Sequence, residues 1–586
     1  MASERNEGGT TGKKVVIVGG VAGGASCAAR LRRQREDLEI VLLDRGKYVS
    51  FANCGLPYYV GEVITDEAKL LVATPELFQQ RFNIQVRVET DVLSIERTRK
   101  ELSVRDLATG AVTTERYDTL VLSPGATPVV PPLPGIDLPG IFALRTIPDS
   151  RRIREWIAER NVRSAVVIGG GFVGLEMAEN LVHKGLAVTL LELGPQVMPP
   201  FDPEMAHLLH AELRAHGVDL RLGDGAASFE AVAGGIKVRT KAGAELDAGL
   251  VFLAIGVRPE TSLAREAGLQ LGRTGGIAVD EQMRTSDPDI FAVGDVVEVK
   301  TVPQQRSALI ALAGPANRQA RVAADVIAGK GRPFRGVQGT AVCGVFGLTA
   351  ALTGESERSL KLAGHPHHGK VYLNPGHHAA YYPGAKPIFI KLLFDLQNGR
   401  VLGFQAVGEE GVEKRVDVVA MALQMRATVY DLEEAELCYA PQYGAAKDPV
   451  NVAGMIASNV LRGDLELADW ESLDAGDKTL LDVRGPGEYA AGHVPRAINI
   501  PLPMLRERMN ELPRDKEVWV YCGVGQRSYY ACRALSQNGF HARSLPGGIQ
   551  AYRCLRPAGP LAQDDGIDRG ADPSASPTAR TPIATR

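Results

Sequence analysis

The sequence lacks any run of apolar residues that approaches the about 20 a membrane-spanning helix needs, and residues 1–12 lack the apolar core of a signal peptide. Seven cysteines in 586 residues, without regular spacing, are not typical of a disulfide framework and indicate a reducing compartment. The formal net charge of −3 provides no basic field that would attract nucleic acid. These absences predict a cytoplasmic protein with no membrane insertion and no nucleic-acid partner.

The composition is that of a folded protein with several domains. Apolar residues make up 45% and charged residues 23%, as in ordinary soluble chains. At about 150 residues per domain, the length suggests about four folded units. Residues 461–470 are polar enough to form a linker, and residues 1–12 and 563–586, which hold few large apolar residues, are predicted to be disordered tails.

Two segments carry the pattern of a nucleotide-binding βαβ unit, residues 13–46 and residues 164–194. Each has a β-branched strand, a glycine turn, a helical stretch and a second strand that ends in an acid. The glycines let backbone N–H groups approach a pyrophosphate at the helix N-terminus. The predicted nucleotide-binding residues are Gly19, Gly20, Gly23, Gly24, Asp44 and Arg45 in the first copy, and Gly169, Gly171, Gly174 and Glu192 in the second.

The acid at the end of the second copy indicates which nicotinamide cofactor binds there. Glu192 can accept hydrogen bonds from a ribose diol, and its charge repels a 2′-phosphate. The sequence therefore favours NADH over NADPH, although neighbouring arginines could reverse this preference.

A third motif follows the two glycine turns along the chain. Residues 285–299, "TSDPDIFAVGDVVEV", place Asp295 after an apolar strand and a glycine. Two glycine turns followed by this motif resemble the two-dinucleotide flavoproteins of the pyridine nucleotide-disulfide oxidoreductase family. The resemblance implies FAD at the first site, NAD(P)H at the second, Asp295 on the flavin ribityl chain, and Ser123 and Gly125 where "LVLSPGATP" leaves the FAD domain.

The same resemblance implies an α/β fold with two Rossmann-like domains and an α+β dimerisation domain. The predicted limits are 13–125 and 250–330 for the FAD-binding domain, 126–249 for the NAD(P)H-binding domain and 336–460 for the dimerisation domain.

One cysteine, Cys54 in "YVSFANCGLPYY", has no partner thiol five positions earlier, because that position is Val49. A two-thiol disulfide centre is thereby excluded. Two kinds of single-cysteine chemistry remain: a sulfenic acid cycle, as in NADH oxidases and peroxidases, or a mixed disulfide with a small thiol. "SFANCGLPYY" closely resembles the motif of CoA-disulfide reductases, and the histidine usual in the first glycine turn of the sulfenic acid branch is replaced by Ala22.

Basic residues follow the first glycine turn. Ser26, Arg30 and Arg33 fall on one stripe of a helix, where two guanidinium groups could bind phosphates or could form a solvated basic face. By resemblance to CoA-disulfide reductases, the residues that contact coenzyme A are Ser26, Arg30, Arg33, Ser50 and Asn53.

Two segments of the third domain, 378–386 and 437–451, resemble parts of the family's dimerisation domain that reach the partner's active site. By this resemblance Tyr381 and Tyr439 contact the leaving sulfur and Lys447 contacts a CoA phosphate. Tyr382 and Tyr443 stand close by as alternatives. The implied active unit is a homodimer.

The C-terminal part carries a second candidate sulfur site. Cys522 ends the strand "EVWVY" and begins "CGVGQRS", a loop whose backbone N–H groups can surround a thiolate or persulfide. Residues 466–558 resemble a single-domain rhodanese, an α/β domain, which makes Cys522 the persulfide carrier and places Arg527 at the mouth of its loop.

Other reactive-looking residues are predicted to be structural. Cys27, Cys343 and Cys438 lie in apolar or helical contexts typical of small core residues, and Cys532 and Cys554 also look structural. A histidine cluster lacks the carboxylate or cysteine spacing of a metal site, so no metal is predicted; it consists of His365, His367, His368, His377 and His378.

Together these features predict an NADH-dependent FAD enzyme that reduces CoA disulfide, CoA persulfide or polysulfide, with a rhodanese domain that carries sulfane sulfur. The sequence does not rank these substrates. An NADH oxidase or peroxidase is one alternative. A sulfur-relay protein, in which the flavin half only regulates the rhodanese domain, is the other.

Overall fold

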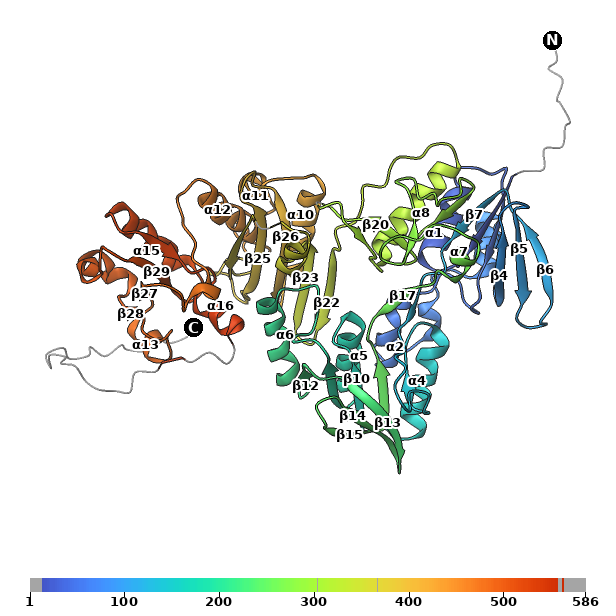
Figure 1. Ribbon diagram of the computed structural model, residues 1–586, viewed down its shortest axis with the longest axis horizontal. Coiled ribbons are helices and arrows are strands. Elements are labelled where there is room, and N and C mark those ends of the chain that lie inside the picture. Colours follow the sequence, from blue (N-terminus) through green and yellow to red (C-terminus); the bar gives the residue numbers. More distant parts are fainter. Residues whose placement is uncertain (1–12, 303, 366, 557–560, 563–586) are drawn as a thin grey trace, which may run out of the picture. The chain divides into compact units, whose positions relative to one another are not determined.

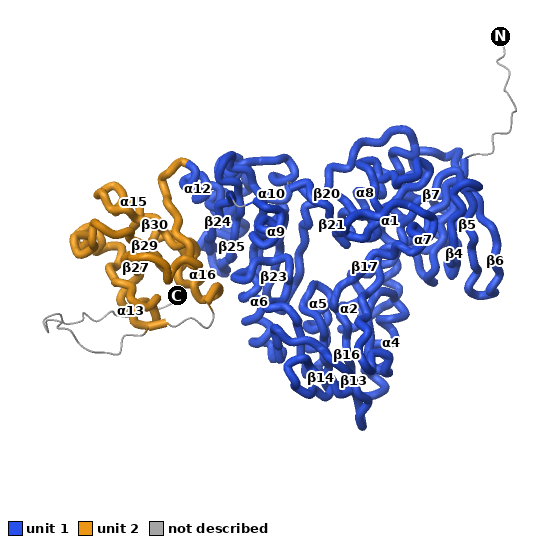
Figure 2. Tube along the Cα trace, viewed as in Figure 1, with its two compact units in different colours: residues 1–461 blue, residues 462–586 orange. Residues whose placement is uncertain are grey.

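The computed structural model describes residues 13–302, 304–365, 367–556 and 561–562. The chain divides into two compact units, residues 1–461 and residues 462–586 (Figure 2). The tails predicted to be disordered, 1–12 and 563–586, lie outside the described residues. Among the helices of the described ranges, none has the length and apolar character needed to cross a membrane.

The first sheet of unit 1 is parallel, with the strand order β19-β7-β1-β2-β3 (Figure 1). Four of its strands are short apolar runs that are almost fully buried, as expected where helices cover a parallel sheet, whereas the edge strand β3 is more polar and partly exposed. Helix α1 packs against α8 beside this sheet. The bounds are β1 (Lys14–Val18), β2 (Glu39–Leu43), β3 (Gln85–Arg87), β7 (Thr119–Leu122), β19 (Ile290–Ala292), α1 (Ala22–Arg32) and α8 (Ala313–Ile327).

The second sheet repeats this architecture, with the order β12-β11-β10-β16-β9 and parallel pairing throughout. The sequence repeat is therefore a structural repeat. The bounds are β9 (Ile141–Phe142), β10 (Ser164–Ile168), β11 (Ala187–Glu192), β12 (Asp219–Leu222), β16 (Leu250–Leu253), α4 (Ile147–Glu159), α5 (Phe172–His183) and α6 (Pro203–Ala215).

Smaller sheets, antiparallel except for the parallel β18–β20 pair, and short helices surround the two Rossmann-like sheets. The strands are β4 (Thr90–Glu96), β5 (Glu101–Asp106), β6 (Val112–Arg116), β8 (Ala126–Pro128), β13 (Ala226–Val232), β14 (Gly235–Thr240), β15 (Glu245–Ala248), β17 (Val257–Pro259), β18 (Ile277–Ala278), β20 (Val297–Lys300) and β21 (Ser307–Ala308). The helices are η1 (Asn53–Gly55), α2 (Leu56–Val60), η2 (Glu67–Leu70), α3 (Pro75–Phe82) and α7 (Ser262–Glu266).

The last part of unit 1 is an antiparallel sheet with the order β22-β23-β26-β25-β24, against which α10 packs (Figure 1). Strands β25 and β26 are completely buried and mainly apolar, with Lys391, Asp395 and Gln405 as buried polar exceptions. The bounds are β22 (Ala341–Val345), β23 (Leu348–Gly354), β24 (His368–Leu373), β25 (Ile388–Asp395), β26 (Val401–Gly408), α9 (Glu357–Leu362), α10 (Val412–Gln424), α11 (Val429–Glu434) and α12 (Pro449–Leu461).

Unit 2 holds a parallel sheet with the order β28-β27-β29-β30. The bounds are β27 (Lys478–Asp482), β28 (Ile498–Asn499), β29 (Glu517–Tyr521), β30 (Ala542–Ser544), η3 (Trp470–Ser472), α13 (Pro486–Ala490), η4 (Leu502–Met504), α14 (Leu505–Arg508), η5 (Met509–Glu511), α15 (Gln526–Gln537) and α16 (Gly548–Leu555). These sheets confirm the predicted fold class.

The prediction of a linker at 461–470 is wrong for most of that segment. Leu465, Ala468 and Trp470 are buried in unit 2, and the Trp470 indole N–H donates to the Pro546 carbonyl at 2.8 Å. The alternation of these apolar residues with acids made the segment look polar overall. The segment is part of the second fold, whose start the sequence predicted at residue 466.

Candidate active site

A cavity of about 420 Å³ lies at the carboxyl ends of β1 and β2, next to the N-terminus of α1. Eight of the nine residues predicted to bind FAD line it: Gly19, Gly20, Gly23, Asp44, Arg45, Ser123, Gly125 and Asp295. The ninth, Gly24, lies behind the turn, where a Cβ would stand 1.8 Å from the Gly19 carbonyl oxygen. Gly24 therefore permits close helix–strand packing rather than ligand approach.

The backbone at the turn fits a pyrophosphate. Gly19 has φ +95°, and a Cβ there would lie 2.1 Å from the Ser123 carbonyl oxygen. The turn leads directly into α1, so the free N–H groups and the dipole of that helix end face the cavity. These features suit the anionic centre of a dinucleotide.

The acids that end β2 and β11 hold their glycine turns in the same way. Asp44 accepts hydrogen bonds from the backbone N–H groups of Gly20 and Gly46, each at 2.7 Å. Glu192 accepts from Gly170 and Gly194, also at 2.7 Å. Each carboxylate thus braces its turn with one lone pair on each oxygen, and a ribose would use the others. Burial raises the pKa of Asp44 despite these bonds.

The second glycine turn has the same construction as the first. Gly169 has φ +105°, and a Cβ at Gly174 would lie 1.9 Å from the Gly169 carbonyl oxygen. A Cβ at Gly171 would meet no atom within 4 Å, so the space next to it is open. The structure therefore brings Gly169, Gly171, Gly174 and Glu192 together at one edge of the second sheet.

Sequence reasoning missed other residues of the first cavity. Arg145 lines it, donates to the Pro124 carbonyl at 2.8 Å, and has its pKa lowered by burial. Lys47, Tyr48 and Glu260 also line the cavity. None of them belongs to a glycine motif, so no pattern in the sequence indicated them.

A second cavity of about 440 Å³ lies among α1, α3 and α8. Four of the residues predicted to contact coenzyme A line it: Ser26, Arg30, Arg33 and Ser50. The fifth, Asn53, lines the first cavity instead. Two further arginines, Arg81 from α3 and Arg321 from α8, line the second cavity and were missed because only the folded chain brings these helices together.

This second cavity, hereafter the basic pocket, is not uniformly cationic. Arg30 donates to Asp325 at 2.7 Å, and Ser26 donates to the Asn317 side chain. The Arg33 guanidinium stands 6.0 Å from the centre of the Phe82 ring. The pocket therefore combines several guanidinium groups with an aromatic face, which suits a phosphorylated ligand that carries an aromatic ring.

The segment 50–54 joins the two cavities. Ser50 lines the basic pocket, whereas Phe51 and Asn53 line the first cavity. Ser50 has φ +47°, unusual for a residue with a side chain, and its N–H donates to the Gly20 carbonyl at 2.7 Å. The first glycine turn thus fixes the segment that presents Cys54.

Cys54 is a free, exposed thiol in the 3-10 turn that leads into α2. The pKa of its thiol lies above the ordinary value, because of partial burial and because of the negative charges of Glu176 and Asp295. Thiol exchange, one of the two chemistries open to a single cysteine, uses the thiolate. Burial and the acidic charges nearby instead favour the thiol form in the protein alone.

Glu176 lies on α5, two positions after Gly174, and is close to the Cys54 helix. Burial and the neighbouring charge of Glu179 raise the pKa of Glu176 to about 7, while a hydrogen bond from Tyr58 opposes this. Above pH 7 the carboxylate is therefore ionised and disfavours ionisation of Cys54.

We expect Glu176→Gln to lower the pKa of Cys54, because the variant removes a negative neighbour. Alkylation of Cys54 by iodoacetamide at pH 8 should become about threefold faster, while at pH 5.5, where Glu176 is protonated, the two proteins should react alike. Peptide mapping of the modified cysteine across this pH range checks the result. Equal rates at pH 8 would show that Glu176 does not act on the thiol.

The two tyrosines predicted to act on sulfur do meet. The hydroxyl groups of Tyr381 and Tyr439 lie 2.6 Å apart, and their side chains are 75% and 48% exposed. The bond raises the pKa of Tyr381. Lys447 is also exposed. None of the three lines either cavity described above.

Cys522 directly follows β29 and is buried. The Gly525 N–H donates to its sulfur at 3.1 Å, and Gly525 has φ +117°. Arg527 forms a two-bond ion pair with Glu488, at 2.6 and 2.8 Å. A Cβ at Gly548 would lie 2.4 Å from the Cys522 carbonyl oxygen, so a second glycine-rich segment closes tightly on the cysteine.

The other cysteines follow the sequence prediction with one exception. Cys27, Cys343, Cys532 and Cys554 are buried, and burial raises the pKa of Cys27 to about 12. The prediction that Cys438 is a core residue is wrong, because this thiol is exposed in the loop that carries Tyr439.

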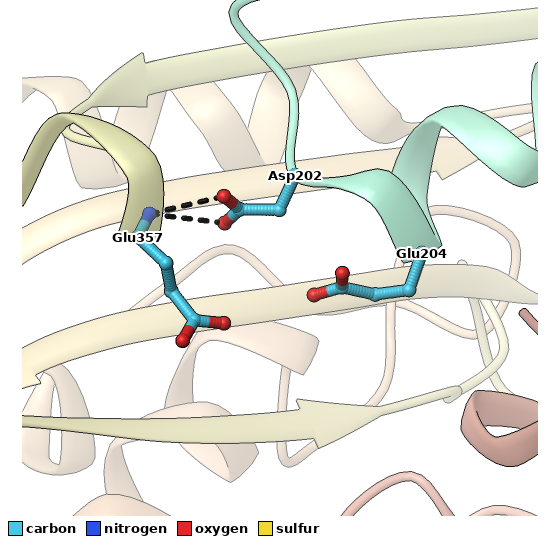
Figure 3. A group of neighbouring side chains, drawn as sticks. All are labelled: Asp202, Glu204 and Glu357. Atoms are coloured by element: carbon cyan, nitrogen blue, oxygen red, sulfur yellow. Dashed lines mark hydrogen bonds between the residues drawn. The ribbon is translucent and has the colours of Figure 1, made fainter. Parts of the chain in front are cut away.

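Three carboxylates gather where α6 meets the antiparallel sheet: Asp202, Glu204 and Glu357 (Figure 3). The ammonium group of Lys391, which is completely buried, contacts all three and lies 2.8 Å from Asp202. The charges of Lys391 and Lys370 help keep the pKa of Glu357 well below its usual range despite burial. The cation of this cluster is thus supplied by the chain itself.

The two repeated dinucleotide turns, the thiol beside the first of them and the cysteine loop of unit 2 define a two-dinucleotide disulfide reductase joined to a rhodanese. The chain belongs to the pyridine nucleotide-disulphide oxidoreductase family, whose model matches residues 13–320. The dimerisation domain of that family matches residues 340–448, and a rhodanese-like domain matches residues 469–553. These matches confirm the resemblances found in the sequence; the finer domain limits given above stay predictions.

Relatives share most of the chain. The coenzyme A disulfide reductase of Staphylococcus haemolyticus is 33% identical over 449 residues, 76% of this chain and all of that one. The crystal structure of reduced Bacillus anthracis CoADR-RHD is 46% identical with a TM-score of 0.92, covering 93% of this chain and 99% of that one. A NAD-dependent persulfide reductase from A. fulgidus is 37% identical with a TM-score of 0.86, covering 92% and 100%.

Proposed function

We propose that the protein is an NADH-dependent flavoprotein that reduces CoA disulfide or CoA persulfide at Cys54, and that Cys522 carries sulfane sulfur. The carrying observation is the placement of Cys54 directly after a segment that lines both the dinucleotide cavity and the basic pocket. A ligand in the basic pocket would extend its sulfur toward the same thiol that a dinucleotide would approach from the other side. Relatives named for the same substrates support the proposal.

The residues present fit FAD in the first cavity, where Gly19, Gly20, Gly23, Asp44, Ser123 and Asp295 would hold it. Bound FAD would pass two electrons from NADH to sulfur. The acid-ended turn at Glu192 would hold the nicotinamide coenzyme, with Gly169 and Gly171 at its pyrophosphate.

Cys54 would attack the disulfide of the substrate as a thiolate. A bond forms between Cys54 Sγ and one sulfur of CoA disulfide, and the other CoA leaves as a thiolate. Two electrons and one proton from NADH, with a second proton, balance the release of the second CoA and regeneration of Cys54. With CoA persulfide the products are CoA and hydrogen sulfide.

Because the pKa of Cys54 is raised, forming its thiolate would need a nearby positive charge or hydrogen-bond donor. The two charges that act on the thiol, Glu176 and Asp295, are negative and oppose its ionisation. Ala22 stands where a histidine acts in the sulfenic acid branch of the family, and it lines the first cavity without any proton-transferring group. This observation favours thiol exchange over peroxide chemistry.

The matched dimerisation domain and the exposed tyrosine pair together support a homodimer as the active unit. In such a dimer Tyr381 and Tyr439 would complete the partner's thiol site, and Lys447 would lie near its CoA phosphates. The exposure of these three side chains in one chain is what that arrangement requires.

Anaerobic NADH oxidation with added substrates tests the proposal. CoA disulfide or CoA persulfide should drive stoichiometric NADH loss, and hydrogen sulfide should appear only with the persulfide. A protein that consumes NADH with oxygen but with neither CoA species would instead be an oxidase, and the proposal would be wrong.

A further inference from the structure

Glu488 and Arg527 form an ion pair at the mouth of the Cys522 loop. The two Nη atoms of Arg527 donate to the two carboxylate oxygens of Glu488, which also accepts the Gly485 N–H at 3.1 Å at the start of α13. Two strong bonds and a backbone anchor therefore hold the carboxylate in one place. Contact with Arg527 helps lower the pKa of Glu488 to about 2, so the carboxylate is charged at any physiological pH.

Arg527 also faces the reactive sulfur. The Glu488 carboxylate is the main reason that the pKa of Arg527 is raised, and the Cys522 sulfur adds to the effect. A Cβ at Gly523 would lie 3.3 Å from an Arg527 nitrogen, so the guanidinium lies across the loop. The guanidinium is thus held between one fixed anion and the sulfur.

The Cys522 loop contains no second cationic side chain that could attract an anionic sulfur donor. Among residues 522–528, Arg527 alone is charged. Arg484 lies close enough to Glu488 to help lower the pKa of that carboxyl. Its guanidinium is buried and forms several hydrogen bonds with Asp482. The charge next to the sulfur is therefore nearly cancelled by Glu488.

We propose that Glu488 is a specificity-determining residue that, by neutralising Arg527, directs Cys522 toward persulfide donors and away from dianionic thiosulfate. The inference rests on the proposed role of Cys522 as sulfur carrier and names its donor. Transfer from thiosulfate forms a sulfur–sulfur bond at the Cys522 thiolate, breaks the thiosulfate sulfur–sulfur bond and releases sulfite with the electron pair. Transfer from a persulfide anion releases a thiolate in the same way.

The size of the effect follows from Coulomb's law. One unit charge acting on a dianion about 6 Å away in a solvent-like dielectric contributes roughly 1.4 kcal/mol, which is about tenfold in a rate or binding constant. The pair is partly exposed, with side chains 37% and 46% accessible, so the high-dielectric figure is the appropriate one.

The test uses the full-length protein, anaerobically, with cyanide as the sulfur acceptor and either thiosulfate or glutathione persulfide as the donor. We expect Glu488→Gln, which keeps an acceptor for Gly485, to raise kcat/KM for thiosulfate about tenfold, mainly through KM, and kcat/KM for the singly charged persulfide about threefold, so that the ratio of the two donors changes about threefold. The gain should shrink with added salt. Glu488→Asp, which restores the charge, should behave like wild type.

A matched control comes from Glu511, whose carboxylate forms a similar two-bond pair with Arg508 at 2.7 Å on a separate element. Glu511→Gln should leave kcat/KM unchanged for both thiosulfate and glutathione persulfide. If Glu488→Gln leaves the ratio of the two donors unchanged, or if wild type prefers thiosulfate, the inference is wrong. If neither donor loads Cys522 in wild type, the carrier role itself fails, and the inference with it.

Discussion

Replacing Cys54 with serine should abolish NADH-dependent reduction of CoA disulfide, by a factor of about 10³ or more. The hydroxyl cannot replace a thiol as the group that accepts and releases a sulfur substituent, and removal of a nucleophile costs factors of this size elsewhere. The loss should appear in kcat, since the variant leaves unchanged the basic pocket that we propose binds the substrate. Anaerobic absorbance at 340 nm, with protein fully loaded with FAD, measures it.

Two other cysteine variants make this result specific. Cys438→Ser removes the other exposed thiol and should leave CoA disulfide reduction within twofold of wild type. Cys522→Ser should also leave it unchanged while abolishing thiocyanate formation from a persulfide donor. Equal loss of NADH oxidation in Cys522→Ser would mean that the flavin half does not turn over without the rhodanese cysteine, which would favour the sulfur-relay alternative.

The parts of the site that the sequence predicted are those held by local motifs. Gly19, Gly20 and Gly23 lie at one short turn from a strand into a helix, so their role can be predicted without the fold. The cysteine loop at 522–528 is local in the same sense. Their chemistry depends on backbone geometry that a few residues determine.

The parts that the sequence did not predict come from segments far apart in the chain. Arg81 and Arg321 join Arg33 only because α3 and α8 pack beside α1. Asn53 lines the dinucleotide cavity rather than the basic pocket, because the chain turns into the 3-10 helix η1 at this residue, after Ser50 has faced the basic pocket.

The sequence also did not predict which charged side chains lie next to the two reactive cysteines. The sequence indicates the chemistry of Cys54, whereas the pKa of its thiol depends on its burial and on the charges of Glu176, a residue far along the chain, and Asp295. The sequence did not indicate the Glu488–Arg527 pair either, because the two residues stand 39 positions apart. Electrostatic partners of this kind need coordinates.

Glu192 and Leu193 should together set the choice of nicotinamide coenzyme. We expect Glu192→Ala combined with Leu193→Arg to raise the ratio of kcat/KM for NADPH to that for NADH about 100-fold. Loss of the carboxylate removes repulsion of the 2′-phosphate, and a guanidinium there can bind it in two-bond fashion; each is worth about tenfold. Leu193 is 62% exposed, so the arginine has room. Steady-state kinetics with CoA disulfide measures the ratio.

The structure separates the two roles of Glu192. Its carboxylate braces Gly170 and Gly194, so Glu192→Ala alone should weaken both coenzymes as the turn loosens. Glu192→Asp keeps the charge on a shorter side chain, so it should bind NADH more weakly without binding NADPH more tightly. This variant therefore distinguishes loss of the hydrogen bonds that brace the turn from loss of charge repulsion. The positions after Glu192, from Leu193 to Pro200, contain no arginine or lysine that could reverse the preference.

The cation to consider is Lys241, which approaches Gly225 from the same side as Leu193. If wild type uses NADPH as well as NADH and Lys241→Ala removes only the NADPH activity, then a lysine from the neighbouring hairpin outweighs the carboxylate. In that case Glu192 mainly braces the turn. If Lys241→Ala leaves kcat/KM unchanged for both NADH and NADPH, the preference between them depends on the Glu192 carboxylate itself. The repeated geometry of Asp44 and Glu192 leads us to expect this result.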